Sequence, residues 1–272
     1  MSSRSLDDAK RLVLAWPGRN LPILTPMAFW WDGQHVWFST SGGSLKASAL
    51  RRDASCAMYV PPVPGAEDGL MLRGTARVFH SGDPLGLAIH AGLLAAAQGA
   101  LMVKHASSMM GYVVDAPRVP IRFQPQQRVL VRVRVDDQVE VTQPAIGLGI
   151  APALPTEVPP EVRRTLAGQR RIVLGTQIDG GIGLMPAVWG AGFSLTLPEG
   201  MGVAEGTAVT AVIDHAPGFR PTEVMGLSLS GSVAAGGPAL KIVPSKVRWW
   251  SGFQLHSAEL SGRPTDTIVI PD

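Results

Sequence analysis

The chain has 272 residues, of which 46% are hydrophobic and 17% are charged, a composition that argues against global disorder and leaves room for two domains. The net charge is +3, and the basic residues are scattered rather than gathered in a stripe with aromatic side chains, which argues against a nucleic-acid partner. The 31 glycines and 23 prolines suit a fold of many short strands joined by turns.

The pattern along the first half predicts strands with a few helices. A capped helix is expected over residues 5–15, and Pro17-Gly18 ends it. Asp32-Gly33 is typical of a hairpin turn. An Ala- and Leu-rich helix is expected to begin at Asp83-Pro84 and to reach His105. The other expected elements are strands over 21–29, 36–38, 56–60, 70–78, 119–123 and 129–141, and a short helix over 45–52.

The N-terminus lacks the apolar core of a signal peptide, and the most apolar segment, 85–103, is interrupted by His90, Gln98 and glycines. We expect a buried helix there rather than a membrane span. The single cysteine, Cys56, lies in an apolar run, which indicates a buried strand residue and a reducing compartment. We therefore expect a cytoplasmic protein without a membrane partner.

Prolines punctuate residues 141–160, which predicts a linker between a first domain, 1–140, and a second domain, 161–272. The second half partly repeats the first. The segment 23–26 resembles 183–186, 69–74 resembles 226–231, and 122–125 resembles 241–244, at offsets of 160, 157 and 119. Three matches in the same order favour a tandem repeat over chance similarity between Gly- and Pro-rich strands.

Thr40, Ser44 and Lys46 surround two glycines at the expected start of the short helix. Hydroxyl groups, backbone N–H groups and an ammonium at a helix N-terminus favour an anion such as a phosphate monoester. The alternative is an ordinary polar loop, with Ser44 as helix N-cap and Lys46 in solvent, and the spacing alone favours that alternative.

The segment from Pro22 to Asp53 resembles the cofactor-binding region of the pyridoxamine phosphate oxidase-like, FMN-binding split β-barrels. The similarity extends over roughly residues 10–130 and more faintly over the second half. Ala54 replaces the proline that ends the family's pattern. The residues that carry the resemblance are Phe38, Thr40, Ser44, Lys46, Leu50 and Asp53.

The resemblance implies a mainly β fold with a few helices, arranged as two tandem split β-barrel domains. It implies that Ser39 and Thr40 contact the cofactor and that Ser44 and Lys46 hold its phosphate. It also places the strand with Thr25 and Pro26 along the flavin ring. Two family cations are missing, because Leu45 replaces an arginine, and Trp30 or Trp31 replaces a strand lysine. This loss argues against pyridoxamine phosphate as the substrate and favours the flavin and deazaflavin reductase branch.

We therefore expect an oxidoreductase that uses FMN or the deazaflavin coenzyme F(420) on a small organic substrate, with no metal site. The catalytic residues are not identified. The alternatives are a non-catalytic flavin or haem carrier and a ligand-free scaffold. The second half has Leu197-Pro198-Glu199-Gly200 in place of the phosphate loop, so we expect it to be degenerate. The halves are expected to pair within the chain or in a homodimer.

Overall fold

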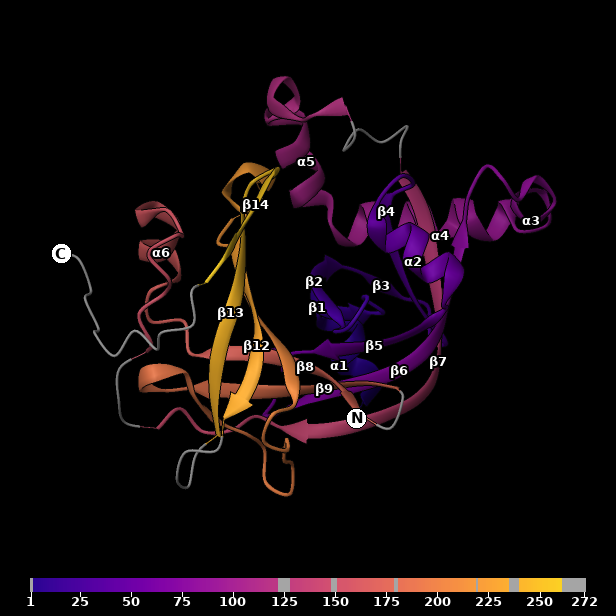
Figure 1. The fold of residues 1–272 in the computed structure, drawn as a ribbon. Coiled ribbons are helices and arrows are strands. Elements are labelled where there is room, and N and C mark those ends of the chain that lie inside the picture. The colour runs from indigo at the N-terminus through magenta and orange to yellow at the C-terminus, as the bar shows by residue number, and fades with distance from the viewer. Residues whose placement is uncertain are drawn as a thin grey trace. The chain divides into compact units, whose positions relative to one another are not determined.

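The computed structural model describes residues 2–121, 128–147, 151–178, 181–218, 220–234 and 240–260. The chain divides into two compact units, each with its own seven-stranded sheet (Figure 1). The first unit consists of Met1–Arg19, Thr25–Glu140 and Phe219–Pro221, and the second of Asn20–Leu24, Val141–Gly218 and Thr222–Asp272.

The sheet of the first unit has the strand order β2-β1-β5-β6-β7-β4-β3. Only Phe29 separates β2 from β3, so one stretch of chain pairs with β1 at one edge of the sheet and with β4 at the other. The sheet therefore closes on itself as a barrel. Its strands are β1 (Arg11–Trp16), β2 (Ile23–Ala28), β3 (Trp30–Trp31), β4 (His35–Ser41), β5 (Ser55–Val60), β6 (Asp68–Phe79) and β7 (Arg128–Thr142).

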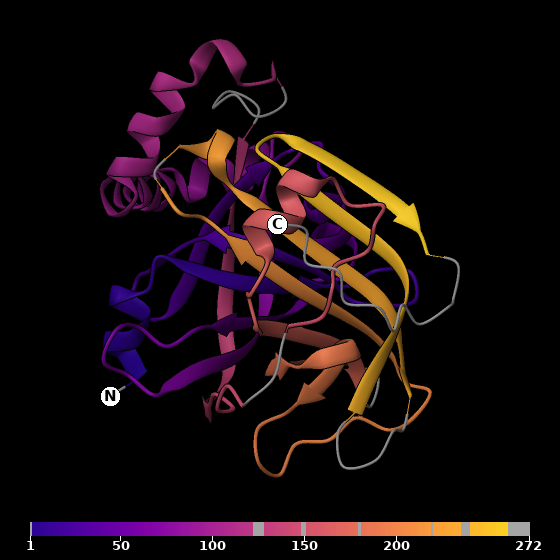
Figure 2. The ribbon, with the colours of Figure 1, turned by 90° about the vertical axis from the view of Figure 1, so that its left-hand side faces the viewer.

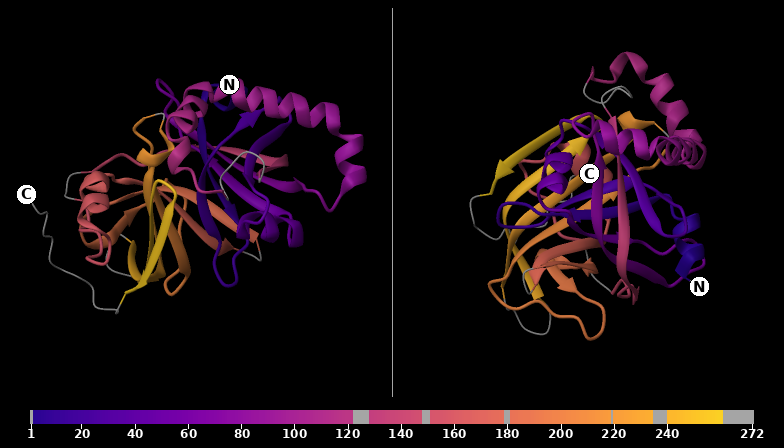
Figure 3. Two further views of the ribbon diagram at one scale, coloured as in Figure 1. Left: turned by 90° about the horizontal axis from the view of Figure 1, so that it is seen from above. Right: turned by 90° about the vertical axis from the view of Figure 1, so that its right-hand side faces the viewer.

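Helices lie in two connections of this barrel, besides α1 (Ser2–Asp8) at the start of the chain. The helix α2 (Leu45–Arg52) joins β4 to β5, as the sequence predicts. A longer helical excursion joins β6 to β7, and Figure 3 shows it running along the first unit. It consists of α3 (Pro84–Ile89), α4 (Ala91–Lys104), α5 (Ala106–Val114) and the 3-10 helix η1 (Ala116–Arg118).

Three expected elements differ from the structure. The helix expected over 5–15 is wrong beyond Asp8, because 11–16 is strand β1, whose Val13, Leu14 and Ala15 pair with β5. The single helix expected up to His105 is broken at His90, whose ring packs against Phe79 at 5.5 Å between centroids. The expected strand 119–123 is not formed over 119–121, and its last two residues lie outside the described residues.

The sheet of the second unit has the strand order β10-β9-β8-β11-β12-β13-β14 (orange to yellow in Figure 2). β10 also pairs with β13, so six of these strands close into a barrel and β14 adds to one edge. The strands are β8 (Arg171–Ile178), β9 (Gly181–Trp189), β10 (Ser194–Thr196), β11 (Ala208–His215), β12 (Met225–Ala234), β13 (Leu240–Ser251) and β14 (Gln254–Glu259). Short helices are α6 (Pro160–Leu166), η4 (Ala191–Phe193) and η5 (Pro221–Glu223).

Both barrels have the same strand connectivity. The order β2-β1-β5-β6-β7-β4 in the first becomes β9-β8-β11-β12-β13-β10 in the second, with each strand replaced by the one that holds the same place in its half. The chain therefore consists of two tandem split β-barrels, as the resemblance implies. β7 runs to Thr142 and α6 begins at Pro160, while the expected domain boundaries at 140 and 160 stay predictions.

Two pairs of glycines explain why the segment 69–74 resembles the segment 226–231. A Cβ at Gly74 would collide with the carbonyl oxygen of Arg134 in β7, and a Cβ at Gly231 would collide with that of Val243 in β13. A Cβ at Gly69 or Gly226, near the start of the same strands, would lie 2.8 Å from the carbonyl oxygen of Val60 or 2.7 Å from that of Ile213. A side chain at these places would push neighbouring strands apart, so both barrels require glycine there.

The same contacts also give an offset to compare with the third sequence match. Arg134 and Val243 hold equivalent places, at an offset of 243 − 134 = 109, whereas the match of 122–125 with 241–244 requires 119. The first-half member of that match, 122–125, lies outside the described residues. That match therefore stays a prediction.

Candidate functional site

The predicted phosphate loop lies between β4 and α2, and Ser44 is the N-cap of α2. Its Oγ accepts a hydrogen bond from the backbone N–H of Ala47 at 3.1 Å, and its own N–H donates to the carbonyl oxygen of Ser41 at 3.0 Å. Thr40 Oγ1 lies 3.3 Å from Ser44 Oγ, so the two hydroxyl groups are hydrogen-bonded. The loop thus brings Thr40 and Ser44 together at the start of the helix, and the N-cap role of Ser44 agrees with the alternative interpretation of the motif.

Lys46 does not extend into solvent, although the interpretation of the motif as an ordinary polar loop expects it to. Its side chain is only 8% exposed, and its Nζ donates to the Sδ of Met27 in β2 at 2.7 Å. Burial, and then the positive charge of Arg128, lower the pKa of the Lys46 ammonium from 10.5 to about 7. Among the described residues, no carboxylate pairs with Lys46. A buried cation without a counter-ion is costly, and an anion would remove that cost.

Arg128, which the sequence analysis did not identify, brings a second cation to this place. It is the first residue of β7, and β7 pairs with β4 so that Arg128 lies opposite Ser41. Its Nε donates to Ser39 Oγ and its Nη2 donates to the Ser39 carbonyl oxygen, both at 2.7 Å. Leu45, which replaces the family's arginine, is 80% exposed. The position after Ser44 therefore carries no cation, but Arg128 brings one to this site from a distant strand.

A sequence signal for Arg128 does exist. Arg128, Arg132 and Arg134 are four and two residues apart, so they face the same side of β7. The pairing of β7 with β4 is what puts the first of them beside Ser39, and pairing between strands so far apart in the chain has no local signature.

Thr25 and Pro26 lie on β2, where both are partly exposed. Thr25 Oγ1 accepts a hydrogen bond from Trp16 Nε1 at 3.1 Å. Two residues further on the same face of the strand, Met27 contacts Lys46. The structure therefore groups Ser39, Thr40, Ser44 and Lys46 with Arg128, and it links them to the strand of Thr25 and Pro26 through Met27. The cofactor contacts of these residues stay predictions.

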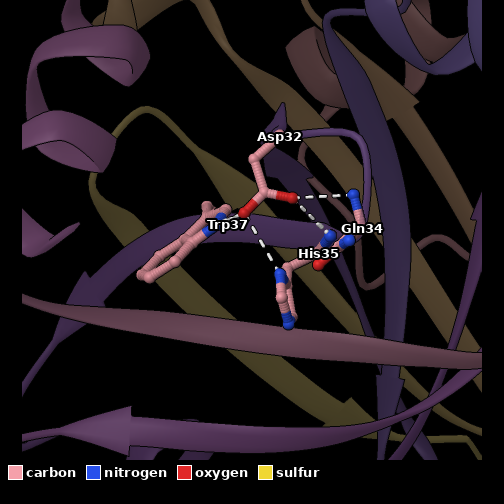
Figure 4. A network of polar contacts seen from close by, with 4 residues as sticks. All are labelled: Asp32, Gln34, His35 and Trp37. Atoms are coloured by element: carbon pink, nitrogen blue, oxygen red, sulfur yellow. Dashed lines mark hydrogen bonds and ion pairs between the residues drawn. The ribbon is translucent and has the colours of Figure 1, made fainter. Parts of the chain in front are cut away.

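A second polar network lies at the turn that leads into β4 (Figure 4). The carboxylate of Asp32 accepts hydrogen bonds from the backbone N–H of Gln34 at 2.8 Å, the backbone N–H of His35 at 2.6 Å and Trp37 Nε1 at 2.7 Å. Burial raises the pKa of Asp32, but these hydrogen bonds outweigh it and the pKa is lowered. His35 Nδ1 is 3.1 Å from the same carboxylate. Asp32 thus positions the start of β4.

Other candidate features lie away from the Lys46 loop. A pocket of about 640 Å³ is lined by Trp31 and by residues of the β3–β4 turn and of β7, and it includes none of the six predicted cofactor residues. Cys56 is buried, and burial, followed by Asp136 and Asp53, raises the pKa of its thiol to about 12, which fits an inert strand residue.

Within the described parts of the chain, no group of three potential metal ligands occurs, and no helix is long and apolar enough to cross a membrane.

The second unit holds a different structure where the first has its loop and α2. The short strand β10 is followed by residues 197–207, all of them described and none of them helical. Glu199 lies in this segment. The expectation that the second barrel carries no cofactor of its own stays a prediction.

No protein-family model and no curated protein matches the chain. Solved structures do. A protein of the pyridoxinephosphate oxidase family related to general stress protein 26, from Clostridium acetobutylicum, is 19% identical, with 52% of this chain and 85% of that chain covered and a TM-score of 0.34.

An F(420) reductase is 20% identical, with coverage of 50% and 94% and a TM-score of 0.34. The haem storage protein HutZ from Vibrio cholerae is 14% identical, with coverage of 52% and 93% and a TM-score of 0.34. Each of these matches covers about half of this chain. The assignment of its fold rests on its own strand order.

Proposed function

We propose that the first barrel binds a phosphate-bearing flavin or deazaflavin and that the protein is an oxidoreductase for a small organic substrate. The observation that carries this proposal is the buried Lys46 ammonium, which lies close enough to Arg128 for the two charges to repel and has no described carboxylate as partner. A phosphate would neutralise both cations and accept their hydrogen bonds.

The neighbouring groups suit the same anion. Ser44 caps α2, so the partial positive charge of that helix N-terminus points to the same loop. Thr40 and Ser44 offer hydroxyl groups that can turn from each other toward a phosphate oxygen. Arg128 holds Ser39 in place through two hydrogen bonds, so Ser39 is positioned before any ligand arrives.

The cofactor supplies hydride transfer when bound. The residues of this chain bind its phosphate and orient it relative to β2, where Thr25 and Pro26 are partly exposed. FMN and F(420) both present a phosphate to such a loop, so the cation pair is compatible with either. Haem presents carboxylates rather than a phosphate, and among the described residues no histidine is hydrogen-bonded to Ser39, Thr40, Ser44 or Lys46, which favours a flavin or deazaflavin.

The visible absorption spectrum of the purified protein, followed by titration with FMN and with F(420), tests the proposal. We expect one of them to bind to the wild type, and Lys46→Met and Arg128→Met each to weaken binding at least tenfold. Arg52→Met is the matched control, because Arg52 is an exposed cation on the same helix. Failure of both cofactors to bind, or equal weakening in the control, would overturn the proposal.

A further inference from the structure

The helical excursion between β6 and β7 has an unusual surface. Fourteen large hydrophobic residues are exposed among the described residues, and nine of them lie between Pro84 and Ile121. They include Leu85, Ile89, Val103, Met110, Val113 and Ile121, whose exposed fractions run from 59% to 79%. At roughly 100 Å² for each of the nine, the excursion exposes about 900 Å² of apolar side chain in total.

The helix α4 has two apolar faces, of which only one is covered. Leu94, Ala97 and Leu101 lie on the inner face and pack against Trp37 and Phe79 of the barrel. The opposite face carries Gly92, Ala96, Gly99 and Val103, all of them exposed. A Cβ at Gly92 or at Gly99 would meet nothing within 4 Å, so the space above both glycines is open. A helix that is apolar all round is normally buried on both sides.

The charge pattern of this surface selects among possible occupants. From Ala91 to Val114 the sequence contains one lysine and no Asp, Glu or Arg. That lysine, Lys104, donates to the Leu6 carbonyl oxygen at 3.1 Å and lies 4.5 Å from the centre of the Phe29 ring, so it belongs to the inner face. A helix that lies on a membrane normally carries Lys and Arg on its polar face, and a charged protein partner would need a complementary charge. An uncharged apolar face can meet an identical face without repulsion.

We propose that two copies of this chain pair through the outer faces of α4 and α5. A standard interface buries about 800 Å² from each partner, and the six exposed large hydrophobic residues of α4 and α5 supply roughly 600 Å² of it before the exposed alanines and glycines are counted. Pairing of identical copies places the same residues on both sides of a two-fold axis. Gly92, Ala96 and Gly99 allow the two α4 helices to approach closely, and Leu93 and Val103 flank them. This proposal does not depend on cofactor binding.

Sedimentation velocity of the full chain at micromolar concentrations tests the pairing. We expect the wild type to be a dimer and Val103→Glu to be a monomer with an unchanged circular dichroism spectrum. Leu255→Glu is the matched control, because Leu255 is 68% exposed on β14, outside the excursion, and this variant should remain dimeric. A monomeric wild type, or a dimer that Val103→Glu leaves intact, would overturn the proposal, and so would binding of a monomer to lipid vesicles through this face.

A cysteine placed near the expected two-fold axis tests the geometry independently. Ala96→Cys should form a disulfide between two chains under mild oxidation, since the single native cysteine, Cys56, is only 4% exposed. Leu255→Cys should not cross-link at the same concentration. Equal cross-linking of both variants would mean random collision and would contradict the proposed axis.

Discussion

The Nζ of Lys46 lies 2.7 Å from the Sδ of Met27, so a buried ammonium joins α2 to β2 through a neutral sulfur. A thioether is a weak hydrogen-bond acceptor and does not neutralise a cation. Below about pH 7 the ligand-free protein therefore holds a buried charge that no described carboxylate pairs with. This relationship leads to the first two predictions.

Lys46→Met is expected to stabilise the ligand-free protein while it weakens binding of the anionic cofactor. The substitution replaces an unpaired buried charge with an apolar side chain of similar length, and we expect the free energy of unfolding to rise by about 1–4 kcal/mol. Urea denaturation of the cofactor-free protein measures this change. A loss of stability in Lys46→Met would show that the ammonium has a partner after all.

The stability of the ligand-free protein is expected to rise with pH between about pH 7 and the ordinary lysine pKa of 10.5. Because the folded pKa of Lys46 is lowered to about 7, the unfolded chain binds more protons in this window, and the slope approaches 1.4 kcal/mol per pH unit. Below pH 7 the penalty is fully present. Denaturation across this range should show the slope in the wild type and a shallower slope in Lys46→Met, and identical slopes would contradict the assignment.

Arg128→Lys is expected to weaken cofactor binding by roughly ten- to a hundredfold, although it keeps the positive charge. Only the arginine fork can donate to both the hydroxyl and the carbonyl oxygen of Ser39, so lysine leaves Ser39 less well positioned. Titration with whichever cofactor the wild type binds measures the loss. Arg134→Lys, an exposed arginine on the same strand, should leave the affinity unchanged.

Gly74→Ala and Gly231→Ala are expected to destabilise the protein by about 2–4 kcal/mol each. In both barrels the added methyl group would collide with a backbone carbonyl oxygen of the next strand, which cannot move aside without breaking the sheet. Gly202→Ala is a suitable control, since a Cβ there meets nothing within 4 Å. Thermal unfolding compares the three variants, and a neutral result at either strand glycine would contradict the close approach.

Asp32→Ala is expected to cost about 2–3 kcal/mol, because the substitution leaves the Nε1–H of the buried Trp37 without its acceptor. Asp137→Ala removes an exposed carboxylate of the same unit and should change stability by less than about 0.5 kcal/mol. Chemical denaturation of the two variants gives the comparison. Equal effects would mean that the turn network does not depend on Asp32.

Local sequence patterns predicted much of the fold. Alternating apolar residues indicated the strands, Ser44 indicated the start of α2, and the spacing of Gly69 and Gly74 recurred at Gly226 and Gly231. The helix expected over 5–15 wrongly includes most of β1, because a short apolar segment fits either structure and only its pairing with β5 makes it a strand.

The sequence by itself determined most strands and the candidate loop, because turns, caps and strand alternation act over a few residues, whereas the tandem barrels were implied by the resemblance to a known family. Only the tertiary structure decided how deeply Lys46 is buried and which second cation lies near it. It buried Lys46 against Met27, 19 positions earlier in the chain, and brought Arg128 to Ser39 across 89 positions. Burial and the pairing of strands distant in sequence depend on the whole fold. They turn Lys46, which the sequence pattern alone would place in solvent, into a buried cation that no described carboxylate pairs with.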